Sequence, residues 1–128
     1  MSKLSENEIS EKVIGAAIEV HRELGPGLLE SVYEAALFYE LIDQGLHVQR
    51  QVPIETVYKG RNLQVGFRID LLIEDRVILE LKAVDSIKNV HLAQTLTYLR
   101  LSQLKLALIL NFNVKVMKSG IKRVVNGL

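Results

Sequence analysis

The segment 67–84 constrains the fold most strongly, because its pattern of apolar and charged residues suits only one strand register. It reads FRIDLLIEDRVILELKAV. If Ile73 pairs with Val77 across a three-residue loop, one face of the resulting hairpin is wholly apolar. That face holds Ile69, Leu71, Ile73, Val77, Leu79 and Leu81. A two-residue turn would put Asp70 and Glu80 on opposite faces, so burial of one clean apolar face selects the first register.

That register sets two carboxylates side by side. Asp70 lies opposite Glu80, and Lys82 follows on the same face of the second strand. Cross-strand Cβ atoms are roughly 4.5–5.5 Å apart, and like charges at that distance repel each other. A divalent cation such as Mg²⁺ would offset the repulsion, since hard cations bind carboxylate oxygens. Two acids and a lysine around one metal fit phosphoryl chemistry. The alternative is an ordinary ladder of surface ion pairs.

Two helices are predicted before the hairpin. Ser5 and Glu8 form the pattern of a capping box, and apolar residues then recur at helical spacing as far as Leu24. Gly25-Pro26-Gly27 ends this first helix, and the second is expected over 28–44, where Gly45 stops it.

Strands and a third helix make up the rest of the chain. Alternation over 48–57 predicts a strand, Tyr58-Lys59-Gly60-Arg61 a hairpin turn, and 63–67 the returning strand. Two further strands are expected over 68–73 and 77–84, a helix over 88–103, and a strand over 105–112 that is buried on both faces. The segment 114–125 predicts a final strand or hairpin. The order ααββββαββ indicates an α/β fold with a mixed sheet.

Composition narrows the class of protein. A chain of 128 residues that is 48% hydrophobic and 24% charged is typical of one globular domain, expected here over residues 1–128. Cysteine is absent, which excludes disulfide scaffolds, thiolate zinc sites and cysteine nucleophiles. No apolar run reaches membrane-spanning length, and the polar, acidic N-terminus is unlike a signal peptide. We therefore expect a cytoplasmic protein with no membrane partner.

Charge is unevenly distributed along the chain. Residues 1–45 carry 3 basic and 9 acidic side chains, whereas residues 46–128 carry 13 basic and 6 acidic ones. This asymmetry is compatible with a polyanionic partner for the second half. The alternative is a solvated basic edge strand, since lysine at a sheet edge prevents aggregation.

Two motifs resemble a known group of enzymes. Asp70, nine intervening residues and then Glu80-Leu81-Lys82 resemble the D-x(n)-E-x-K core of the PD-(D/E)XK nuclease superfamily. The stretch Gly27-Leu28-Leu29-Glu30-Ser31-Val32-Tyr33 resembles the signature of the GxxExxY proteins, a small family placed in that superfamily. The resemblance covers residues 9–125, although Ile69 stands where the superfamily name has proline. It implies a single-domain fold in which helices flank a central mixed sheet.

The resemblance also implies an activity and a set of site residues. The activity is Mg²⁺-dependent hydrolysis of phosphodiester bonds, with Mn²⁺ able to substitute. Asp70 and Glu80 would be metal ligands, Glu30 would add a helix carboxylate, and Lys82 would position the attacking water. Tyr33, three residues after Glu30, either forms a hydrogen bond near the site or packs in the core.

The third helix carries a further match. Gln94-Thr95-Leu96-Thr97-Tyr98 fits the Q-x-x-x-Y pattern of RecB-like nucleases, and His91 lies on the same helical stripe. In that setting Gln94 and Tyr98 would touch the site or the nucleic-acid backbone. The alternatives are a core tyrosine with a wet hydroxyl, and for His91 a surface position.

The leading hypothesis is therefore a metal-dependent nuclease. Its partner would be nucleic acid, with DNA favoured over RNA, and a homodimer is one way in which so small a chain would gain specificity. Two alternatives remain open: a catalytically inactive nucleic-acid-binding module, and a protein-interaction module with the same fold. The 5% aromatic content argues against a dedicated base-stacking surface.

Overall fold

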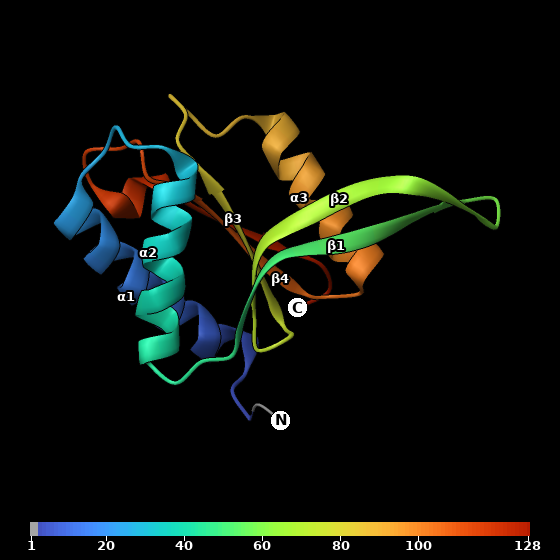
Figure 1. Ribbon diagram of the computed structural model, residues 1–128, viewed down its shortest axis with the longest axis horizontal. Helices are drawn as coiled ribbons and strands as arrows, with labels where there is room; N and C mark the ends of the chain where they lie inside the picture. The colour runs from blue at the N-terminus through green and yellow to red at the C-terminus, as the bar shows by residue number, and fades with distance from the viewer. Residues whose placement is uncertain (1–2) are drawn as a thin grey trace.

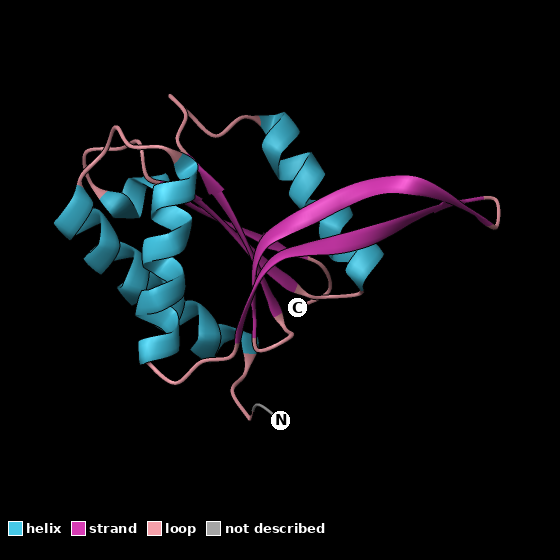
Figure 2. Ribbon diagram, viewed as in Figure 1, coloured by secondary structure: helices cyan, strands magenta, loops and turns pink. Residues whose placement is uncertain are grey.

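The structure is a computed structural model that describes residues 3–128. A five-stranded sheet in the order β1-β2-β3-β4-β5 has two helices on one face and a third on the other (Figure 1; Figure 2). The elements are α1 (Glu6–Leu24), α2 (Glu30–Asp43), β1 (Val48–Tyr58), β2 (Arg61–Ile73), β3 (Val77–Lys82), α3 (Asn89–Ser102), β4 (Leu106–Asn111), the 3₁₀ helix η1 (Met117–Gly120) and β5 (Ile121–Val125). The expected α/β class is confirmed.

The strand count differs from the expected order by one. The segments 63–67 and 68–73 form one continuous strand, β2, because no turn residue separates Phe67 from Arg68. The order is therefore ααβββαββ, with η1 before the last strand. The sheet is mixed as expected: β3 and β4 run parallel, joined by α3, and the other neighbours are antiparallel.

The first helix begins where the sequence indicates. Glu8 N donates to Ser5 Oγ at 3.1 Å and Ser5 N donates to Glu8 Oε1 at 2.9 Å, which completes the capping box. Gly25 follows the last turn with a φ of 70°, a conformation that glycine adopts without steric cost. The helix can therefore end abruptly and let α2 return antiparallel over the same face of the sheet.

Two apolar clusters cover the two faces of the sheet. The larger joins α1 and α2 to residues such as Leu71, Leu79 and Leu108. The smaller joins Tyr98 and Leu99 of α3 to the other face. All six residues of β4 are buried, so the expectation of a strand buried on both faces is confirmed. Within residues 3–128, none of the helices combines the length and apolar content that crossing a membrane requires.

The β2–β3 hairpin has the expected register from Ile73 as far as Leu71. Ile73 pairs with Val77 and Leu71 with Leu79. Ile69, however, belongs to the smaller cluster on the α3 side rather than to the same face as Leu71, so the apolar face expected from the sequence was wrong at this position. Strand β2 changes side at Asp70. In β1, Gln51 lies between the partners of Leu71 and Ile69 and has a φ of 52°, which marks the bend.

A close backbone contact holds η1 against β4, and it leads to a prediction about stability. A Cβ added to Gly120 would lie 2.1 Å from the Asn111 carbonyl oxygen, so the backbone would have to move. We expect Gly120→Ala to lower the free energy of unfolding by roughly 1–3 kcal/mol. The control is Gly15→Ala in α1, where the new methyl group meets nothing within 4 Å and helix propensity improves. Urea unfolding of both variants tests this, and equal stability of the two would contradict it.

Candidate active site

Asp70 and Glu80 lie where strands β2 and β3 separate. Leu71 and Leu79 form the last pair of the ladder on this side. Beyond it, carboxylates take the place of backbone acceptors: Glu80 Oε2 accepts from Asp70 N at 3.0 Å, and Asp70 Oδ2 accepts from Leu81 N at 2.9 Å. Each carboxylate is thus held by the backbone beside the other, and the two acids are brought together.

Burial and mutual repulsion make both carboxylates difficult to ionise. Burial, and then the charge of Asp70, raise the pKa of Glu80 to about 8. Burial also raises the pKa of Asp70, against the lowering effect of the Leu81 N–H. The pair therefore holds a proton near neutral pH when no cation is bound.

Lys82 follows Glu80 at the end of β3 and is partly exposed. Its charge lowers the pKa of both carboxylates, although burial outweighs this effect. The ion pairs among residues 3–128 are Arg22–Glu19 and Arg50–Glu34, so the Lys82 ammonium is not held by a carboxylate. The ammonium is close enough to act on charge at the pair while remaining available to a ligand.

The structure adds Glu34, which sequence reasoning missed. Its side chain on α2 is only 9% exposed, and its charge raises the pKa of both Asp70 and Glu80. Gln51 Nε2 donates to Glu34 Oε1 at 2.7 Å and lies 3.5 Å from Asp70 Oδ1. Arg50 pairs with the other Glu34 oxygen at 3.2 Å. The available signal was its spacing, since Glu30 and Glu34 are four residues apart and share a helix face.

Glu30 lies at the edge of the same site. Its Oε2 accepts from Ala83 N at 3.2 Å, just beyond β3. A hollow of about 390 Å³ is lined by Glu30, Ser31, Glu34, Gln51, Asp70 and Leu81. In the described part of the chain, no three His, Asp or Glu side chains lie close enough together to hold a metal ion. Glu30 as a third ligand therefore stays a prediction.

Comparison with models of protein families shows to which family the chain belongs. A family model of the PD-(D/E)XK nuclease superfamily matches residues 7–124. The chain belongs to the PD-(D/E)XK nuclease superfamily. Searches of curated proteins and of solved structures returned no match. For this member of the superfamily, the assignment of individual residues therefore depends on the geometry of its own site.

Of the predicted residues on α3, Tyr98 is the one that the structure brings toward the carboxylates of Asp70 and Glu80. Burial, and then the charges of Glu80 and Asp70, raise the pKa of Tyr98, whose ring lies 5.0 Å from that of Phe67. Gln94 is exposed on the same helix. His91 Nδ1 accepts from Lys88 N at 3.0 Å, so this imidazole caps the helix start. Roles for Gln94 and His91 toward a ligand stay predictions.

Tyr33, the last residue of the GxxExxY pattern, is completely buried. Its hydroxyl donates to the Gly25 carbonyl and accepts from Leu28 N at 3.1 Å, and its ring stacks on Phe112 at 4.5 Å. These contacts match the packing alternative for Tyr33. The tyrosine closes the loop between α1 and α2 and so sets the position at which α2, with Glu30 and Glu34, begins.

Proposed function

We propose that the protein is a Mg²⁺-dependent nuclease that hydrolyses phosphodiester bonds in nucleic acid. The observation that carries this proposal is the contact between buried Glu80 and half-buried Asp70 beside Lys82, which forms no ion pair with any carboxylate of residues 3–128. Burying two acids side by side costs stability, and this arrangement is typical of sites where function requires concentrated negative charge. Membership of the PD-(D/E)XK superfamily supports the same activity.

The donor set fits a magnesium site. Mg²⁺ prefers carboxylate oxygens and is commonly held by one or two carboxylates, with water and substrate phosphates completing its coordination. Asp70 and Glu80 would supply those carboxylates, and we propose Glu30 as a third, outer contributor. When bound, the ion would lower the pKa of a coordinated water and neutralise charge on the phosphate. Mn²⁺ is expected to substitute, since it accepts the same oxygen donors.

The remaining residues have proposed roles of their own. The Lys82 ammonium would position the attacking water and stabilise charge that develops on the phosphate. Tyr98, and with it Gln94 and His91 on α3, would contact the substrate backbone. Asp70 Oδ2 is held by Leu81 N and Oδ1 lies 3.5 Å from Gln51 Nε2, so the carboxylate keeps a constant direction.

We also propose a narrower family for the chain and a type of nucleic acid as its substrate. The spacing of Gly27, Glu30 and Tyr33 supports membership of the GxxExxY family. The basic second half of the chain supports a nucleic-acid substrate, for which we favour DNA. A single domain over 1–128, a cytoplasmic location and a homodimer stay predictions.

The test is a cleavage assay on labelled substrates. The protein should cleave at least one member of a panel of single-stranded, duplex and branched DNA and RNA when Mg²⁺ or Mn²⁺ is present, and none in EDTA. Glu80→Ala, prepared in parallel, should lose at least ~10²-fold in rate, as expected when a charged group at the reacting centre is lost. Binding without cleavage on every substrate and metal would contradict the proposal and favour an inactive binding module.

A further inference from the structure

We propose that the outer part of the β1–β2 hairpin, residues 52–68, enters the major groove of duplex DNA beside the site. We call this segment the arm. The inference depends on the proposed function for its substrate class, but it concerns a surface that the site residues do not include. It commits the site to a duplex rather than to a single strand.

The arm projects from the body of the protein. It begins at the bend formed by Gln51 and Asp70, and β2 extends from Asp70 back to Arg61, a distance of roughly 30 Å for nine residues of strand. In Figure 1 the two strands pass α3 and continue well beyond it. Lys59 and Gly60, both with positive φ, make the two-residue turn at the tip. A substrate lying along the arm would therefore lead directly to Asp70.

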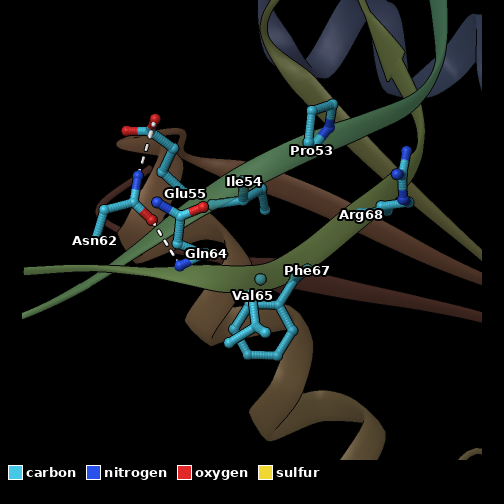
Figure 3. Close-up of a pocket in the computed structure, with 9 residues that line it drawn as sticks. Pro53, Ile54, Glu55, Asn62, Gln64, Val65, Phe67 and Arg68 are labelled. Carbon is cyan, nitrogen blue, oxygen red and sulfur yellow. Dashed lines mark hydrogen bonds between the residues drawn. The ribbon is translucent and has the colours of Figure 1, made fainter.

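The two faces of the arm differ in chemistry. Figure 3 shows Val65 and Phe67 pointing toward α3, while Pro53, Glu55 and Arg68 point away from it. A hollow of about 330 Å³ lies along the middle of the arm, with Asn62, Gln64 and Arg68 among its lining residues. Polar groups on the arm thus continue outward from Asp70.

The charges on the arm suit a polyanion. Lys59, Arg61 and Arg68 are exposed, and the arm's one acid, Glu55, accepts a hydrogen bond from Asn62 Nδ2 at 3.4 Å. Arginine, asparagine and glutamine are the side chains that bind base edges in the major groove, where they form bidentate contacts with guanine and adenine. The B-form major groove also has the width to admit a two-stranded β-ribbon. The charge, side chains and shape of the arm therefore all match duplex DNA.

Other partners fit the arm less well. Binding of single strands relies on stacked aromatic rings, but Phe67 is already packed against Tyr98 beneath the arm, and Tyr58 has the Lys59 ammonium over its ring at 5.4 Å. Addition of a protein strand to the free edge of β1 is hindered by Pro53, which has no N–H to donate. Val57 and Val65 are exposed, so a protein contact is an outcome that the test must detect.

Fluorescence anisotropy in EDTA tests the proposal without cleavage. The probes are a 20-base-pair DNA duplex and one of its single strands. The wild type should bind the duplex more tightly, and the double variant Arg61→Ala/Gln64→Ala should weaken duplex binding by roughly 10-fold or more. Its affinity for the single strand should stay within about twofold, and the salt dependence of duplex binding should fall by about one unit of slope. The control is Lys12→Ala, which removes one exposed positive charge from α1 and should leave both affinities unchanged.

Three results would overturn the proposal. These are equal weakening of duplex and single-strand binding, no weakening of either, and a wild-type dimer in sedimentation that the double variant converts to monomer. Circular dichroism and thermal melts of the double variant should match the wild type, because both substitutions are exposed. Failure of the nuclease proposal gives a different result from failure of the arm proposal. Duplex binding that depends on the arm but occurs without any cleavage would contradict only the nuclease proposal. Cleavage that the arm variants do not affect would exclude only the arm's role.

Discussion

Lys82→Ala should lose most cleavage activity and yet bind Mg²⁺ as tightly as the wild type, or more tightly. Lys82 is proposed to act on water and on charge at the phosphate, and loss of such a group typically costs ~10²–10³ in rate. The same ammonium lowers the pKa of Asp70 and Glu80, which means that it lies within their field. Its removal takes away a cation that repels the metal, so activity and metal affinity should change independently.

Asp70→Asn is the matched variant, and it should change metal affinity in the opposite direction. An amide oxygen can still accept the Leu81 N–H, so the local fold should be retained. Because a negatively charged ligand is lost, Mg²⁺ affinity should fall by more than the ~10–100-fold typical of losing an outer contact. Cleavage should be lost as in Lys82→Ala.

Calorimetric metal titration, cleavage assays and thermal melts on the same preparations separate these roles. Asp70→Asn should not unfold, since relief of carboxylate repulsion favours the metal-free state. Lys82→Ala should also stay folded, because it shortens a partly exposed side chain at the end of β3. Wild-type cleavage by Lys82→Ala would contradict the proposed mechanism. Normal metal binding by Asp70→Asn would instead contradict its assignment as a ligand.

The second large effect is the change in the stability of the folded protein with pH in the absence of metal. Burial and the neighbouring Asp70 raise the pKa of Glu80 from 4.5 to about 8 in the folded protein. The folded state therefore keeps a proton that the unfolded chain releases, so the stability that Glu80 contributes is fully present below pH 4.5 and is lost as pH rises toward 8. The loss is on the order of a few kcal/mol between pH 5 and 8.

Glu80→Gln should remove this dependence, because its side chain is neutral throughout. Urea unfolding in EDTA at several values between pH 5 and 8 should show a flatter profile for the variant and greater stability than the wild type at pH 8. Glu23→Gln, the same change on the exposed surface of α1, should keep the wild-type slope. Added Mg²⁺ should stabilise the wild type more at pH 8 than at pH 6, since binding requires the ionised carboxylate. Parallel profiles for wild type and Glu80→Gln would refute the assignment.

Features that depend on neighbouring residues could be predicted from the chain alone. The capping box at Ser5 and the end of α1 at Gly25 follow from local hydrogen bonding and backbone freedom. The register that pairs Ile73 with Val77 follows from alternation, because a slip of one residue would turn the apolar side chains to the wrong face. The closeness of Asp70 to Glu80 came from that register. The sequence by itself therefore determined the α/β class and the register from Ile73 to Leu71, at the end of which Asp70 and Glu80 lie.

Only the tertiary structure decided what surrounds that pair. The change of side at Asp70 and the positive φ of Gln51 arise because β2 must serve both the sheet and the arm, a conflict that alternation does not reveal. Glu34 reaches the site because α2 packs across the sheet and because Gln51 and Arg50, on β1, hold its carboxylate. Tyr33 is fixed by Gly25 and Phe112. Partners far apart in the chain are chosen by packing, whereas periodicity reports only on residues within the same helix or hairpin.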